Sequence, residues 1–166
     1  QLTVTIGKYY RVTGDSTQHR GVEPDITLPS LLSTTDLGES TQESALPWDR
    51  IDAAKFTPEQ AAMPALPLLS REHDERVAQN PDFVALEGDV DAMERLRTQR
   101  DVSLNLVKRR AERDAFEAER LARENARRVA HGLAPFPTIA ALDEAKAPDT
   151  VLDEAIEIAT DAVQLP

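Results

Sequence analysis

Eight small or aliphatic residues between positions 104 and 129 recur with the period of an α-helix. Successive members are three, four, four, three, four, four and three positions apart, a mean of about 3.6 residues. We call this set the alanine stripe: Leu104, Val107, Ala111, Ala115, Ala118, Ala122, Ala126 and Val129. A neighbouring helix can approach small side chains closely, so we expect the stripe to be buried and Ala118→Glu to cost several kcal/mol. The stripe predicts a long helix that ends near Gly132.

Three other segments carry helix periodicity. The pattern predicts a helix from Pro64 to the Asn80-Pro81 pair, a second from Pro81 to about residue 96, and a last one that Asp149 caps. Their expected inner faces are Leu66, Leu69, His73 and Val77; Phe83, Leu86, Val90, Met93 and Leu96; and Val151, Leu152, Ala155, Ile156, Ala159 and Val163. Between the long helix and the last one, prolines leave room for at most a short turn at residues 139–144.

The N-terminal part alternates with a period of two residues. Residues 2–12 predict a strand, and residues 22–28, with Pro24, predict a shorter edge strand. Residues 29–57 are rich in Ser, Thr, Asp, Glu and Pro and predict an extended connector, which we expect the only tryptophan, Trp48, to pin onto the rest. The expected fold is mainly α with a small β part: a β-hairpin-like pair of strands in 1–28, the connector in 29–57, and an α-helical domain of about four helices in 58–166.

Charge and composition limit the classes of function. A net charge of -11 disfavours nucleic acid and anionic lipid as partners. Residues 101–131 hold eight bases against six acids, so an ion-paired face is favoured over a nucleic-acid interface there. No cysteine is present, which removes disulfides and thiolate chemistry. No apolar run is long enough to span a membrane, and the chain opens directly into a strand pattern without methionine, so we expect it to be a piece of a longer protein.

The residue types that carry chemistry do not form a recognisable site. His19, His73 and His131 are more than fifty residues apart, which argues against zinc, and His73 is expected to be a hydrogen-bonded structural histidine. Ser70, His73 and Asp74 share one helix and cannot align as a triad. Asp82, Asp89 and Asp91 lack the spacing of a calcium loop. We therefore assign no catalytic residue, no cofactor and no metal.

The segment Tyr9-Tyr10-Arg11-Val12-Thr13-Gly14-Asp15-Ser16-Thr17-Gln18-His19-Arg20-Gly21-Val22-Glu23-Pro24-Asp25-Ile26 resembles the end of the peptidase core in tail-specific (carboxy-terminal processing) serine peptidases. Residues 46–49, 102–106 and 108–112 look like the C-terminal region of the long bacterial periplasmic members. The resemblance implies a parent with a PDZ domain, a serine nucleophile and a lysine general base, both upstream of this chain. Lys8 and Lys55 do not match the base motif. What carries over is structural: Tyr9, Tyr10, Arg11, Gly14, Gln18, Gly21, Pro24 and Asp25.

The resemblance therefore implies the non-catalytic C-terminal part of a periplasmic endopeptidase that processes proteins with apolar C-termini. The helical domain would shape substrate access and dock partners such as an adaptor, and the chain alone is expected to be inactive. A free-standing acidic helical interaction module is the alternative, and nucleic-acid binding by the arginine-rich helix is a third reading. Because a strand cut from its sheet leaves an unpaired edge, we also expect self-association through residues 1–28.

Overall fold

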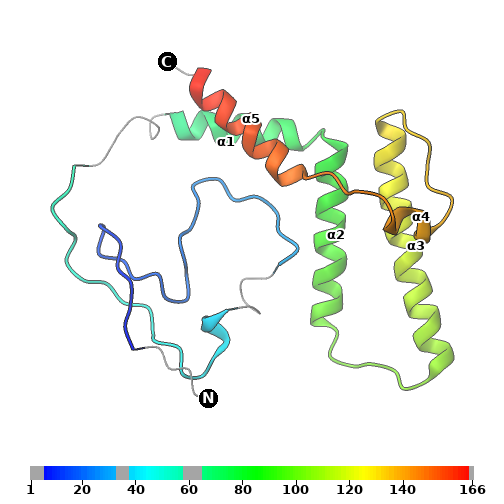
Figure 1. Cartoon of the computed structure of the whole chain (residues 1–166), viewed down its shortest axis with the longest axis horizontal. Helices are drawn as coiled ribbons and strands as arrows, with labels where there is room; N and C mark the ends of the chain where they lie inside the picture. Colours follow the sequence, from blue (N-terminus) through cyan, green and yellow to red (C-terminus); the bar gives the residue numbers. More distant parts are fainter. Residues whose placement is uncertain (1–5, 33–37, 58–64, 165–166) are drawn as a thin grey trace. The chain divides into compact units, whose positions relative to one another are not determined.

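The computed structural model describes residues 6–32, 38–57 and 65–164 and is mainly helical (Figure 1). The chain divides into two compact units, Gln1–Leu66 and Pro67–Pro166. In the described residues of the first unit that precede α1, a short 3-10 helix, η1 (Glu39–Thr41), lies within mostly irregular backbone. The second unit contains the α-helices, of which α1 (Leu66–Val77) begins at the unit boundary. The finer subdivision into strands, connector and helical domain stays a prediction.

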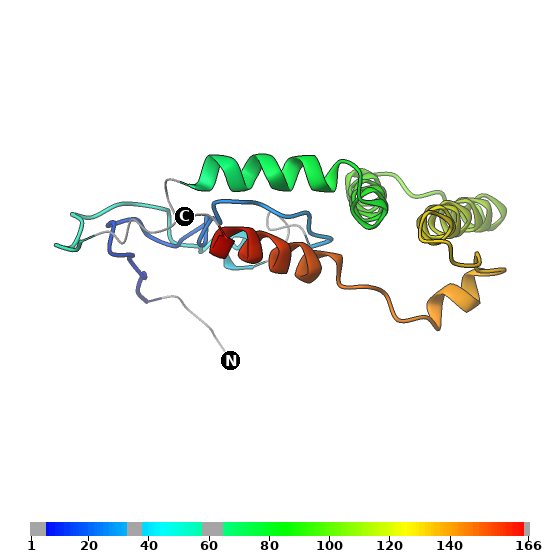
Figure 2. The ribbon, with the colours of Figure 1, turned by 90° about the horizontal axis from the view of Figure 1, so that it is seen from above.

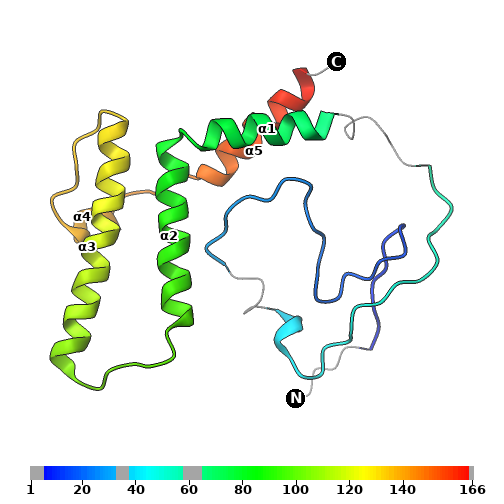
Figure 3. The same ribbon diagram turned by 180° about the vertical axis from the view of Figure 1, so that it is seen from behind.

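The second unit is built around an antiparallel helix pair. α2 (Pro81–Thr98) and α3 (Leu106–Ala130) run side by side, as Figures 1 and 3 both show. The short α4 (Ile139–Asp143) lies against α3, and α5 (Thr150–Gln164) returns to α1 (Figure 2). The predicted helices are therefore present, and α4 occupies the place of the short turn expected at residues 139–144.

Side-chain caps explain where the helices begin and end. The Asn80 side chain accepts a hydrogen bond from Asp82 N at 2.9 Å, and Asp149 Oδ1 accepts one from Leu152 N at 3.1 Å. Asn105 Oδ1 accepts from Val107 N at 2.9 Å, so α3 begins after Asn105 and Leu104 lies outside it. Gly132, with φ of 70°, ends α3 as predicted.

The apolar core of the second unit is small, and part of it lies where α1 meets α2. Among the described residues, the buried apolar side chains are Leu69, Phe83 and Ala92. The ring of His73 meets the edge of the Phe83 ring, with centroids 5.9 Å apart. Farther along the predicted inner face of α2, Met93 and Leu96 are exposed. In α2 the core therefore includes Phe83 in the first turn and Ala92 past the middle of the helix, but not Met93 or Leu96.

The expected burial of the alanine stripe is wrong, which removes the reason to expect that Ala118→Glu costs several kcal/mol. Ala111, Ala115, Ala118, Ala122 and Ala126 are all exposed, as are both valines of the stripe. The face of α3 that meets α2 instead carries charged residues, which pair across the two helices. Charge pairing rather than small-residue packing therefore sets which side of α3 turns inward.

α5 shows the same inversion. Its predicted inner residues Leu152, Ile156 and Val163 are exposed, whereas Glu154 is buried. Glu154 is drawn toward α1 by hydrogen bonds from that helix. Within the described part of the second unit, α3 and α5 thus both present their apolar sides outward.

The predicted N-terminal β-hairpin is also wrong in the residues that the structure describes. Instead of two paired strands it shows isolated bridges, Tyr10 with Ser16 and Asp15 with Arg50. Gly14, His19 and Gly21 have positive φ, which turns the chain back within the segment that should connect the strands. The start of the predicted first strand, residues 2–5, lies outside the described residues.

The connector does fold back onto this turn, as expected from Trp48. The Arg20 guanidinium carbon lies 4.1 Å from the Trp48 ring centroid, and Ser16 N donates to Asp49 O at 3.0 Å. Ile51 N donates to Gly14 O at 2.9 Å. A Cβ on Gly14 would collide with the carbonyl of Ile51, so only glycine allows this close approach.

Gly88 offers a test of how α2 and α3 meet. A Cβ built at Gly88 would lie 2.6 Å from Cδ of Arg123. Gly→Ala inside a helix normally stabilises by about 1 kcal/mol. We expect Gly88→Ala to give no such gain in chemical unfolding, because Arg123 must move. In the Arg123→Ala background the gain should reappear, and an equal gain in both backgrounds would show that Arg123 does not occupy the space.

Candidate functional site

A buried charge cluster joins α5 to α1. Nδ1 of His73 lies 2.7 Å from Oε1 of Glu154, and both side chains are almost fully buried. Arg76, one turn after His73, donates to the same carboxylate at 2.7 Å and to Asp161 at 2.8 Å. Asp161 follows Glu154 by two helical turns, so one face of α5 supplies both carboxylates. We call these four residues the α1–α5 cluster.

The electrostatics of this cluster favour the charged carboxylate. Burial alone would raise the pKa of Glu154, but the hydrogen bonds from Arg76 and His73 outweigh it and hold that pKa below its ordinary value. The hydrogen bond to Glu154 also raises the pKa of Arg76. His73 is thus buried and hydrogen-bonded, as expected from the sequence. Because His73 pairs with Glu154, it is not aligned with Ser70 and Asp74.

A second set of charges crosses from α2 to α3. Arg127 pairs with Asp82 and Arg123 with Asp89, each at 2.7 Å, and Arg95 pairs with Glu119 at 2.8 Å. Exposure of these pairs increases toward the end of the helix pair where the chain passes from α2 to α3. Screening by water therefore weakens the Arg95–Glu119 pair most. We call these three pairs the α2–α3 ladder.

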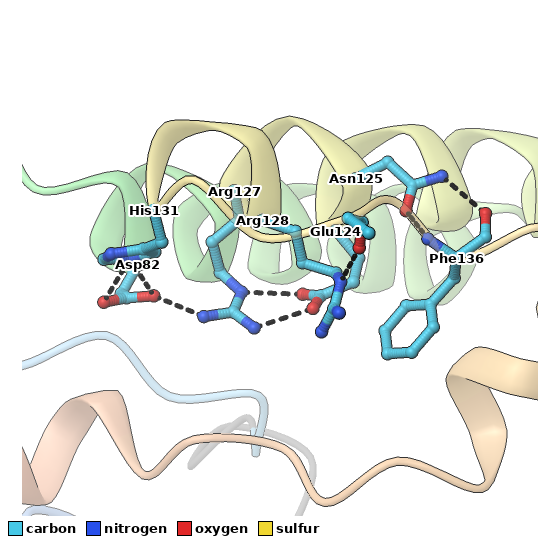
Figure 4. A network of polar contacts seen from close by, with 8 residues as sticks. Asp82, Glu124, Asn125, Arg127, Arg128, His131 and Phe136 are labelled. Atoms are coloured by element: carbon cyan, nitrogen blue, oxygen red, sulfur yellow. Dashed lines mark hydrogen bonds and ion pairs between the residues drawn. The ribbon is translucent and has the colours of Figure 1, made fainter.

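Figure 4 shows how the ladder continues into a network at the end of α3. Arg127 also binds Glu124, and His131 Nε2 lies 3.0 Å from the Asp82 carboxylate. Asn125 exchanges two hydrogen bonds with the backbone of Phe136, at 2.7 and 3.0 Å. Arg128 lies over the Phe136 ring, 4.0 Å from its centroid, and donates to a backbone carbonyl. These contacts hold the loop that follows α3 against that helix.

Most arginines of the arginine-rich helix α3 form ion pairs with acidic side chains. Five of its arginines form ion pairs: Arg109, Arg113, Arg120, Arg123 and Arg127. Within the helix, Glu119 lies 3.9 Å from Arg123 and Glu124 pairs with Arg127 at 2.7 Å. This arrangement supports the ion-paired interpretation of the helix over a nucleic-acid interface.

The remaining candidates stay apart. His73 and His131 belong to different clusters, and His19 is exposed in the first unit. Asp82 and Asp89 each pair with an arginine. In the described ranges, no group of three or more His, Cys, Asp or Glu could hold a metal ion. A helix long and apolar enough to cross a membrane is likewise absent from these ranges.

The motif residues of the first unit surround the docked connector. The Tyr10 hydroxyl donates to the Asp49 carboxylate at 3.2 Å, and Lys8 pairs with Asp49 at 2.9 Å. The hydrogen bond from Lys8 lowers the pKa of Asp49, and burial together with the nearby carboxylate raises the pKa of Tyr10. Lys8 is therefore engaged in an ion pair that holds the connector. The side chains around Trp48 line a separate cavity that is open to solvent.

Sequence analysis missed the α1–α5 cluster except for His73. Glu154 lies in a segment whose apolar residues suggested the opposite inner face. The signal that could have revealed it is the pair of acids at 154 and 161, two turns apart on one face, matched by a basic residue three positions after His73. Apolar periodicity alone could not show that these charges are buried together.

Comparisons with known proteins agree with the residues quoted above. A sequence profile for the family described as the C-terminal domain of tail specific protease matches residues 32–164. Over 166 residues the chain is 36% identical to the protein named tail-specific protease of Haemophilus influenzae, covering 98% of this chain and 24% of that protein. The chain thus spans about a quarter of the length of the curated relative it matches.

The α1–α5 cluster predicts a pH dependence of stability. Because the folded pKa of Glu154 is lowered, its contribution is fully present above the unfolded value of about 4.5 and is lost as the pH falls through the folded pKa. We expect Glu154→Gln to lower the free energy of unfolding by about 3 kcal/mol at pH 7. The loss should shrink below pH 4.5, as measured by urea unfolding at several pH values.

The exposed acid Asp153 provides the matched control. Asp153→Asn removes the same charge one residue away from Glu154, and we expect it to change stability by no more than about 0.5 kcal/mol at pH 7. An equal effect of the two substitutions, or a loss for Glu154→Gln that does not vary with pH, would contradict the role given to the cluster.

Proposed function

The chain belongs to the family of C-terminal domains of tail-specific proteases, and from that membership we propose that it is the non-catalytic C-terminal part of a periplasmic serine endopeptidase. The parent would process or degrade proteins from their C-termini, with a serine nucleophile and lysine base supplied by other parts of the polypeptide. The observation that carries the proposal is the family match over residues 32–164, which spans α1 to α5.

The contacts of the candidate chemical groups support a non-catalytic role. Lys8 is paired with Asp49, and His73 with Glu154. A lysine general base must be free to accept the proton of a nearby serine. Both groups are instead engaged with carboxylates, which supports the proposal.

The outward apolar sides of α3 and α5 support a docking role for the helical domain. α3 extends over 25 residues without a buried side chain, and the alanine stripe faces solvent along it. Because small side chains let another helix approach closely, the stripe suits contact with the remainder of the parent or with an adaptor. In this way the domain would shape the space through which substrates enter.

The same surfaces favour the second candidate function, a free-standing acidic helical module that binds a protein partner. The two candidates differ in what must accompany the chain. The first requires a peptidase core in the same polypeptide, whereas the second requires none. The sequence upstream of Gln1 in the gene discriminates between them.

The chain alone should have no peptidase activity, because the nucleophile and base are supplied elsewhere. Purified chain incubated with an unfolded protein that has an apolar C-terminus should leave the substrate intact, as followed by gel electrophoresis and mass spectrometry. Cleavage that a serine-directed reagent abolishes would refute the non-catalytic assignment.

The docking role predicts a difference between the chain and its parent. In the isolated chain, the double variant Ala118→Glu with Ala122→Glu should change stability by no more than about 0.5 kcal/mol per site, because both alanines are exposed. In the full-length protein the same variant should lower cleavage of an unfolded protein by about tenfold, since carboxylates would enter a buried contact.

Two exposed alanines outside the stripe, Ala130 and Ala145, supply the matched control. Ala130→Glu with Ala145→Glu introduces the same charge and should leave full-length activity unchanged. Equal activity of the stripe variant and the control would contradict docking through α3.

Self-association through residues 1–28 remains a further proposal. Ile6 and Tyr9 are among the exposed residues of this segment. Sedimentation of the whole chain should show concentration-dependent association that a version beginning at Pro58 lacks. If the shorter version associates as strongly, the contact belongs to the helical domain instead.

A further inference from the structure

A cavity of about 320 Å³ lies beside Trp48 within the first unit. Its lining includes three arginines, Arg11, Arg20 and Arg50, together with Ser16 and Trp48. The volume lies at the lower end of the range for small-molecule sites. It suits a ligand the size of one or two amino-acid residues.

The arginines are held to different degrees. Arg50 pairs with Asp15 at 3.2 Å and donates to Thr13 O at 3.4 Å. The Arg20 guanidinium lies over the Trp48 ring, a contact in which its N–H groups stay available to donate hydrogen bonds. The Arg11 side chain has no hydrogen-bond or ion-pair partner among the described residues. Two guanidinium groups are thus available to an acceptor in the cavity.

Ser16 adds an independent indication of an acceptor. Its side chain is 2% exposed, and its Oγ accepts hydrogen bonds from Gln18 N at 3.3 Å and Asp49 N at 3.5 Å. A hydroxyl oxygen has two acceptor positions and one proton to donate. Both acceptor positions are used, so the buried proton still needs an acceptor, which no described residue provides.

The charge of the lining points to a monoanion. Three arginines face two carboxylates, Asp15 and Glu23, which leaves a net charge of one positive unit. A carboxylate would neutralise that charge, whereas a phosphate dianion would exceed it and meet repulsion from the two acids. Guanidinium groups also match the planar geometry of a carboxylate.

We propose that this cavity is a binding site for the terminal carboxylate of a peptide chain, held by Arg11, Arg20 and the hydroxyl of Ser16. The choice of a peptide rather than a free acid rests on the proposed function, in which the parent acts on protein tails. The carboxylate specificity itself rests only on the cavity.

Trp48 provides the measurement, because it is the only tryptophan of the chain and lines the cavity. We expect N-acetyl-Ala-Leu-Ala with a free carboxylate to change its fluorescence saturably. The matching C-terminal amide should bind at least about tenfold more weakly, since it lacks the charge that the guanidinium groups recognise. Acetate alone should bind more weakly than the peptide, and inorganic phosphate should not compete at equal concentration.

Variants locate the site. Arg11→Gln should weaken binding of the peptide acid about tenfold without changing the unfolding transition, because its guanidinium has no described partner. Arg110→Gln removes an equally exposed arginine of the second unit and should have no effect. Isothermal titration calorimetry of the same variants measures peptide binding without relying on Trp48 fluorescence.

Four outcomes would overturn the proposal: equal binding of acid and amide, tighter binding of phosphate, acetate that binds as tightly as the peptide, and no heat or fluorescence change with the peptide acid. An unaffected Arg11→Gln variant would exclude this cavity even if the chain binds carboxylates. If the peptide-binding test fails, the α3 docking experiment is unaffected. If the docking experiment fails, peptide binding to the isolated chain is unaffected, so the two proposals can be judged separately.

Discussion

The carboxylate of Glu154, held between His73 and Arg76, is the contact on which the arrangement of the second unit depends. A buried carboxylate without partners is costly, so α5 must lie where both donors can reach it. Replacing such a contact by apolar residues often leaves stability unchanged. The contact therefore contributes mainly to the orientation of the helices. It selects which side of α5 faces α1 and positions the His73 ring against Phe83.

Because charges occupy the inner faces, most apolar residues of α3 and α5 lie outside. A free-standing domain normally buries such residues, and the apolar core between α1 and α2 is small. A C-terminal domain of a longer protein faces a different requirement, because the rest of that protein can cover such surfaces. The outward apolar sides are thus consistent with a part whose stability is completed by its parent.

Sequence periodicity predicted the helices because their boundaries depend on local chemistry: Asn80 and Asp149 cap within two or three residues, and Gly132 ends α3. Periodicity did not predict which faces of α3 and α5 turn inward, because ion-pair partners more than twenty residues away in the sequence determine those faces. The strands failed for a related reason, because a strand exists only with a pairing partner. The expectation that the chain carries no catalytic residue rests on motifs and stays a prediction. The Trp48 cavity could not be predicted, because it depends on residues that only the fold brings together.

The α2–α3 ladder also encodes the register of the two helices. If α3 slid by one turn in one direction, Glu119 would come opposite Asp89, and two acids would face each other. A slide in the other direction would bring Arg123 opposite Arg95. Only Gly88 leaves room for the stem of Arg123 at the observed position. Each neighbouring alignment therefore places like charges opposite each other. The charge pattern thus favours a single register of the two helices, although each ion pair is weak by itself.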